Sequence, residues 1–161
     1  MQTRELYLKR GKGVIPLSIC NEIVQVIKNI DIHLGQYDLK KFNSFLNEGL
    51  LKTGWSKSAR LSRKSNIAIT AFKKDIGLCV QTGNVARTYA DLLKLQAMYK
   101  NKTIKGAIYI IPQKECAKTI GQNVANFERL QNELINVFHK VITFPMLIVG
   151  FNNEETSNGT N

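Results

Sequence analysis

The sequence has only three cysteines, Cys20, Cys79 and Cys116, and they suit neither a disulfide framework nor a zinc site. Their number is odd, and no pair has the close spacing of zinc-binding or redox motifs. This pattern is typical of proteins in a reducing compartment. We expect Cys20 and Cys116 to fill the core as small apolar side chains.

Long apolar runs are also missing. No stretch approaches the ~20 consecutive apolar residues that a membrane-spanning helix needs. Residues 1–12 are polar and basic and lack the apolar segment of a secretory signal. We therefore expect a protein without a membrane anchor, located in the cytoplasm or on the nucleoid.

Acidic residues are scarce. The chain has 12 Asp and Glu against 23 Lys and Arg, a net charge of +11. An excess of lysine can reflect an AT-rich coding sequence, but here the charge is unevenly placed. No acid occurs between Glu48 and Asp75, and this interval contains Lys52, Lys57, Arg60, Arg63, Lys64, Lys73 and Lys74. The basic interval predicts contact with nucleic-acid phosphates, although an ordinary solvated loop could carry the same residues.

The length of the chain, 161 residues, fits one domain with a single hydrophobic core. Apolar spacing predicts helices at 17–31, 38–49, 85–100 and 115–139, the last of which Gly121 could divide. A hairpin at 66–81 and strands at 105–112 and 146–150 complete an α/β fold with a mixed sheet flanked by helices. Residues 1–16 form a basic arm or an edge strand, residues 17–151 the domain, and residues 152–161 a disordered tail.

The predicted hairpin has the layout of a magnesium-dependent nuclease site. Such sites place carboxylates on two adjacent strands, because Mg²⁺ prefers carboxylate oxygens and stabilises charge on the scissile phosphate. A Lys, Gln or Glu follows two residues after the second carboxylate. In this chain the corresponding places hold Thr70, Cys79 and Gln81.

Several segments resemble type II restriction endonucleases of the BglII and BstYI kind, in the PD-(D/E)XK superfamily. These are the run from Val80 to Gln96, then Gly106-Ala-Ile-Tyr-Ile-Ile-Pro112, Asn123-Val-Ala-Asn-Phe-Glu-Arg129 and, upstream, Leu46 to Trp55. The resemblance covers roughly residues 17–150. It implies a restriction-endonuclease-like fold, a homodimer, and double-stranded palindromic DNA cut with Mg²⁺.

The resemblance also assigns the site residues. The metal-binding Asp falls on Thr70, the Glu on Cys79 and the Gln on Gln81, while a helix-borne Glu would correspond to Glu48. Threonine is neutral, and a cysteine thiolate is a soft ligand that suits Mg²⁺ poorly. We therefore expect a DNA-binding pseudonuclease that needs no metal cofactor.

Two alternatives stay open. The chain could be an active endonuclease that uses Glu48 and Asp75 as displaced Mg²⁺ ligands, or a non-catalytic structural or interaction subunit. For DNA contact, Asn84 and Arg87 open the helix after the hairpin, where side chains can read bases and backbone amides favour phosphate. Asn84 could equally serve turn geometry. We expect Asp91 to form a structural salt bridge or to cap a helix.

Overall fold

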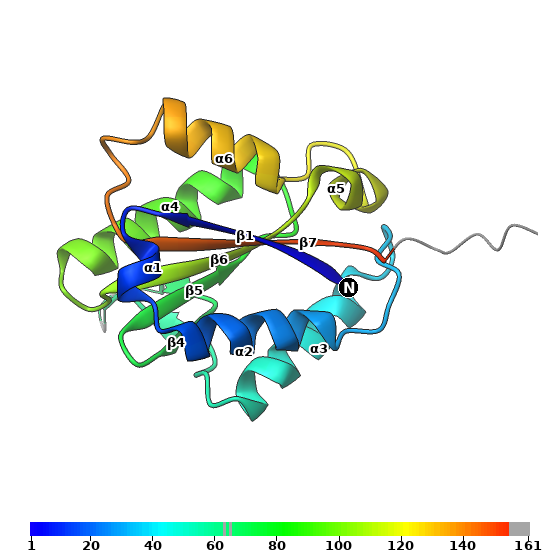
Figure 1. The fold of residues 1–161 in the computed structure, drawn as a ribbon, viewed down its shortest axis with the longest axis horizontal. Coiled ribbons are helices and arrows are strands. Elements are labelled where there is room, and N and C mark those ends of the chain that lie inside the picture. Colours follow the sequence, from blue (N-terminus) through cyan, green and yellow to red (C-terminus); the bar gives the residue numbers. More distant parts are fainter. Residues whose placement is uncertain (63, 65, 155–161) are drawn as a thin grey trace, which may run out of the picture.

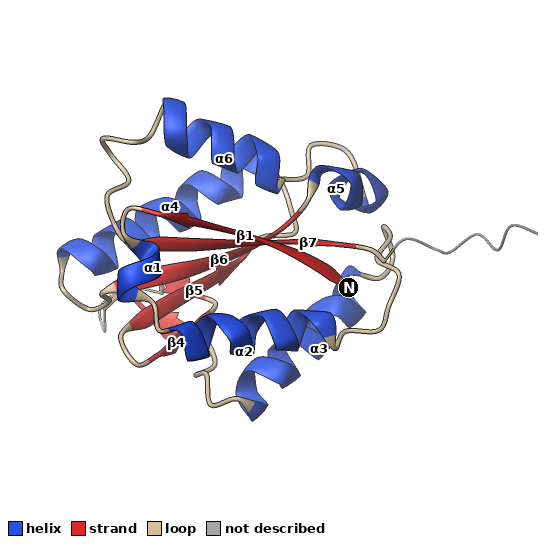
Figure 2. Ribbon diagram, viewed as in Figure 1, coloured by secondary structure: helices blue, strands red, loops and turns tan. Residues whose placement is uncertain are grey.

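The computed structural model describes residues 1–62, 64 and 66–154, and its centre is a mixed sheet between two layers of helices (Figure 1, Figure 2). The five strands lie in the order β1-β7-β6-β5-β4. β5, β6 and β7 are parallel, and β1 and β4 pair antiparallel at the two edges. Their bounds are β1 Gln2–Leu8, β4 Ala71–Lys73, β5 Ile76–Val80, β6 Gly106–Pro112 and β7 Met146–Asn152. This confirms the predicted fold class.

Two helices cover one face of the sheet and two cover the other (Figure 1). α2 (Leu17–Lys28) and α3 (Leu39–Lys52) lie below the sheet in this view, and α4 (Val85–Lys100) and α6 (Phe127–Asn136) lie above it. Two shorter helices, α1 (Gly11–Val14) and α5 (Lys114–Ile120), join these layers to the strands. Within the described residues, no helix has the length and apolar character to cross a membrane.

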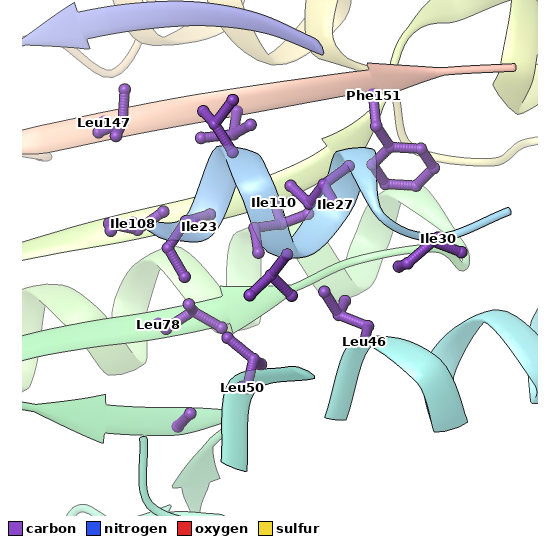
Figure 3. Packing of buried hydrophobic residues seen from close by; sticks show 14 of the residues in the cluster. Ile23, Ile27, Ile30, Leu46, Leu50, Leu78, Ile108, Ile110, Leu147 and Phe151 are labelled. Carbon is purple, nitrogen blue, oxygen red and sulfur yellow. The ribbon is translucent and has the colours of Figure 1, made fainter. Parts of the chain in front are cut away.

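The central strands are apolar along their whole length because both of their faces are buried. Along β6, Ile108 and Ile110 pack toward α2 and α3, and Tyr109 and Ile111 pack toward α4 and α6. Figure 3 shows Ile108 and Ile110 in the first of these layers, close to Ile23 of α2. The strands at 105–112 and 146–150 could be predicted for this reason.

The helices agree closely with their apolar spacing. α4 has the predicted bounds, α2 ends three residues early, and Gly121 separates α5 from α6. α3 continues to Lys52, past the predicted end at Gly49. Gly49 does not cap the helix; a Cβ there would lie 2.7 Å from Cγ1 of Val26, so the glycine allows α3 to approach α2 closely.

Of the two alternatives for residues 1–16, the structure shows the edge strand. β1 pairs with β7 over its full length, from Gln2 opposite Asn152 to Leu8 opposite Met146. Its basic side chains remain compatible with this position because an edge strand is half solvated, and the guanidinium of Arg4 stacks over the ring of Phe127.

The assignment of residues 152–161 to a loose tail is wrong at its start. Asn152 ends β7, and the buried side chain of Asn153 accepts a hydrogen bond from Leu34 N (2.7 Å) and donates one to Leu34 O (3.0 Å). These bonds satisfy both backbone groups of a loop residue, which explains why a polar side chain is buried there. Residues 155–161 lie outside the described part of the chain.

The predicted hairpin is shorter than residues 66–81. β4 and β5 form it through Lys74 and Asp75, which both have positive φ as in a type I′ turn. Residues 68–69 belong instead to β3 (Ala68–Ile69), which pairs with β2 (Ala59–Arg60) in a separate small sheet. Thr70 therefore lies where the chain passes from one sheet to the other.

Candidate functional site

The structure places Thr70 beside Cys79 and Val80 at the carboxyl end of β5, and Gln81 directly follows this strand. Pairing of Ala71 with Leu78 sets this register. The backbone N–H of Val80 donates to Oγ1 of Thr70 at 3.1 Å. The three positions that the resemblance assigns to catalysis thus share one place in the fold.

Cys79 lies in the apolar layer beneath α4 and is 1 % exposed. Burial first, and the negative charge of Asp91 second, raise the pKa of its thiol from 9.0 to about 12. The thiol is therefore protonated at neutral pH. A protonated thiol is neither a ligand for a hard cation nor a nucleophile.

Both ends of the side-chain amide of Gln81 form hydrogen bonds within the protein. Its Nε2 donates to Oδ2 of Asp91 at 2.9 Å, and its Oε1 accepts from the backbone N–H of Gly83 at 2.9 Å. The residue is 6 % exposed. Gln81 thus links Asp91 to the turn that leads into α4, and these two bonds fix the orientation of its amide.

Asp91 is the acid nearest to Gln81, and its predicted salt bridge is confirmed. Oδ1 pairs with Nζ of Lys94 at 2.9 Å, and Oδ2 also accepts from the hydroxyl of Tyr109 at 3.3 Å. Burial first, and the charge of Asp91 second, raise the pKa of Tyr109, so its hydroxyl stays a donor. The sequence analysis did not predict the contact between Asp91 and Gln81. It could have been inferred because Asp91 lies close to the buried Leu92 and Leu95, on a helix that starts shortly after Gln81.

These residues do not fit a Mg²⁺ ion. Thr70 and Cys79 are neutral, and the carboxylate of Asp91 already binds Lys94, Gln81 and Tyr109. Among the residues that the structure describes, no group of three or more His, Cys, Asp or Glu side chains could hold a metal. We derive no metal-dependent step at this site.

The displaced ligands of the active-enzyme alternative lie apart from Thr70. Glu48 pairs with Lys52 at 2.7 Å and lines a hollow with Asp31 on the other side of α3. Asp75 lies in the turn at the opposite end of β5, about 13 Å along the strand from Cys79, where it pairs with Nζ of Lys105 at 3.0 Å. The structure does not bring either acid to the site.

The basic interval divides into different environments. Lys73 is not a surface cation: its Nζ donates to both oxygens of Glu22 at 2.8 Å, and the indole of Trp55 donates to the same carboxylate at 2.7 Å. This lysine ties β4 to α2, which corrects its assignment to DNA contact. Lys74 is exposed in the hairpin turn, away from Thr70.

The remaining cations of the interval differ in their surroundings. Lys57 lines a hollow together with Thr70, Lys52 is exposed but paired with Glu48, and Arg60 and Lys64 are exposed in and after β2. Arg63 lies outside the described residues. Cations that are close together in the sequence therefore lie in different places in the fold.

Asn84 and Arg87 lie at the start of α4, as predicted. Oδ1 of Asn84 accepts from Ala86 N at 2.8 Å, so this side chain caps the helix. The guanidinium of Arg87 is exposed on the first turn. Asn84 thus serves the turn geometry at the start of α4, and the amide Nδ2 of its side chain is left for contact with a base.

A basic hollow beside this helix start was not predicted. It has a volume of about 620 Å³ and lies between α5, α6 and residue Val85. Its cations are Lys114, Lys118 and Arg129. In sequence these residues read as solvated helix surface, because nothing local shows that α5 and α6 meet the start of α4.

Comparisons with known proteins agree with this geometry. A family model described as "Restriction endonuclease BglII/BglIII" matches residues 11–151. The crystal structure of restriction endonuclease BglII complexed with a DNA 16-mer is similar, with a TM-score of 0.82 and 16 % identity over 97 % of this chain and 81 % of that chain. Free BglII gives 0.76 and 17 %, over 97 % and 82 %. No curated protein sequence matches.

Proposed function

The chain belongs to the BglII/BglIII restriction endonuclease family, and from that premise we propose that it binds double-stranded DNA without cleaving it. One observation carries the second half of this proposal. The positions that the resemblance assigns to the family's two metal-binding acids hold Thr70 and a buried, protonated Cys79, and the nearby Asp91 is bound within the protein. DNA binding by this route needs no metal cofactor.

Charge and shape support the DNA half of the proposal. The net charge is +11, and two hollows with exposed cations open on either side of the β5 end, one beside Lys57 and one beside Lys114, Lys118 and Arg129. Cations in such positions can neutralise backbone phosphates. A homologous fold is known in complex with DNA, in the structure of BglII. The site of action would then be the cytoplasm or nucleoid.

The decisive experiment is an incubation with diverse duplex DNA in Mg²⁺ or Mn²⁺. We expect intact DNA and a salt-dependent gel shift. Discrete cleavage that disappears in the Gln81→Ala variant would refute the loss of catalysis. Absence of any gel shift at low salt would instead favour the alternative of a structural or interaction subunit.

We further propose that two copies associate through the outer surface of α4 and α6. Tyr89 of α4 donates to Glu133 of α6 at 3.0 Å, so the two helices form one surface. Four large apolar side chains on α4, on α6 and just after α6 are exposed: Leu93, Ile135, Val137 and Val141. Exposed apolar side chains of this size favour an interaction surface, and a two-fold dimer would cover the same patch on both copies.

A further inference from the structure

A hollow of about 390 Å³ adjoins Thr70, at the place where the resemblance puts the first metal ligand. It lies between the second half of α3, residues 56–58 and residues 69–71. Its polar lining consists of Asn47, Ser56, Lys57, Ser58 and Thr70. Among the described residues that line it, Lys57 carries the only formal charge.

On the α3 side of this hollow, the polar side chain is the amide of Asn47 and not the carboxylate of the adjacent Glu48. Asn47, Leu50 and Leu51 face it, whereas Glu48 lies one residue further round the helix and lines the hollow that contains Asp31. The pairing of Glu48 with Lys52 at 2.7 Å holds its carboxylate on that other side. Among the described residues that line the hollow, Lys57 therefore has no acidic neighbour beside Thr70.

Two hydroxyls of the hollow are arranged as donors. Oγ1 of Thr70 accepts the backbone proton of Val80 at 3.1 Å, and Oγ of Ser56 accepts the backbone proton of Phe72 at 3.0 Å. Each oxygen already accepts one hydrogen bond and keeps its own proton for donation. An ammonium, two hydroxyl donors and an amide suit an anion with several oxygens, and they do not suit a cation.

We propose that this hollow binds a DNA backbone phosphate directly, with Lys57 supplying the positive charge that a metal ion would supply in a cleaving enzyme. This inference rests on the proposed function, since it names the phosphate contact of a DNA-binding protein. Ser56 and Thr70 donate to the phosphate oxygens, and Lys57 neutralises their charge. The contact holds the phosphate without activating it.

The test is fluorescence anisotropy of a labelled DNA duplex, titrated with the protein over a range of salt concentrations in EDTA and in Mg²⁺. We expect Lys57→Ala to weaken binding several-fold and to make the slope of log K against log salt shallower by about 0.9. Lys57→Arg should retain the slope. Thr70→Asp, which places a carboxylate in the hollow, should weaken binding in EDTA more than Lys57→Ala does.

Lys105→Ala is the matched control, because it removes the same charge beside Asp75, at the far end of β5. If Lys57→Ala and Lys105→Ala bind alike while the wild type binds DNA, the phosphate site is refuted and the DNA-binding function stands. If Mg²⁺ strengthens wild-type binding and Thr70→Val abolishes this gain, a metal occupies the site and the inference is wrong. A wild type that binds no DNA would overturn the proposed function together with this inference. Lys57 is exposed, and unchanged thermal melting of each variant will show that its fold is intact.

Discussion

Nε2 of Gln81 lies 2.9 Å from Oδ2 of Asp91, and this hydrogen bond joins the end of β5 to the second turn of α4. The glutamine that the resemblance assigns to catalysis is here part of the internal bonding of the fold. The same carboxylate also binds Lys94 and Tyr109, so three side chains depend on one acid. The predictions below separate such internal roles from contacts with DNA.

Removing Asp91 should destabilise the protein strongly. Asp91→Ala leaves the amide of Gln81 and the hydroxyl of Tyr109 buried without their acceptor, and we expect a loss of about 3 kcal/mol in the free energy of unfolding. Urea denaturation measures this loss. Asp75→Ala is the control, because it removes an exposed pair and should change stability by less than about 1 kcal/mol. Equal losses would show that the Asp91 network is not stabilising.

Stability should fall at alkaline pH because buried thiols retain their protons. The folded pKa of Cys79 is about 12 and that of Cys116 about 11, against 9.0 for the ordinary thiol. Above pH 9 the unfolded chain loses these protons first, so each thiol lowers stability by up to about 1.4 kcal/mol per pH unit until its folded pKa is reached. Urea midpoints between pH 8 and about pH 11 should decline less steeply in Cys79→Ala than in wild type. An unchanged decline would contradict the burial of an ionisable thiol at this position.

Restoring the two acids should not restore cleavage. In the Thr70→Asp, Cys79→Glu double variant, the second new carboxylate enters a space that is closed to solvent and lies beside the charge of Asp91. We expect a loss of about 3 kcal/mol in stability or more, and no Mg²⁺-dependent cutting of duplex DNA. Calorimetry with Mg²⁺ and a plasmid-nicking assay test this, with Thr70→Asp alone as the control for the half-buried position. Site-specific cutting by the double variant would show that only the acids are missing.

Lys73→Ala should affect folding and not DNA binding. The substitution leaves Glu22, which is partly buried, without its cation, and we expect a loss of about 2 kcal/mol. DNA affinity should fall no more than in Lys105→Ala, which removes the same charge from an exposed site. A larger fall in affinity than in Lys105→Ala would show that Lys73 contacts a DNA phosphate.

The proposed dimer predicts that Leu93→Lys yields monomers. Leu93 is 60 % exposed on α4, so a charge there should disrupt an apolar interface while leaving the monomer folded. Light scattering after gel filtration measures the mass of the particle. Leu17→Lys, at a residue 69 % exposed on α2, is the control on the opposite face of the sheet. Monomeric wild type would contradict the proposal.

Much of the fold could be predicted from local patterns, and most of the site could not. β6 and β7 are continuous apolar runs, which indicates strands buried on both faces. α4 has a regular apolar stripe, which indicates a helix buried on one face. β1 carries few apolar residues because it is an edge strand, and its pairing depends on β7, which is far away in sequence. The same holds for the site: the sequence placed Thr70, Cys79 and Gln81 in register, but partners such as Asp91 for Gln81 and Glu22 for Lys73 come from other elements.

The turn after β5 and the segment before α6 are locked together backbone to backbone. Asn84 forms a β-bridge with Val124, Ala125 N donates to Gly83 O at 2.8 Å, and Val85 N donates to Asn123 O at 3.2 Å. Two segments forty positions apart along the chain are therefore joined at the carboxyl end of β5. In the proposed complex with DNA, Arg87 and Arg129 would meet the duplex from the two helices that begin at these joined segments.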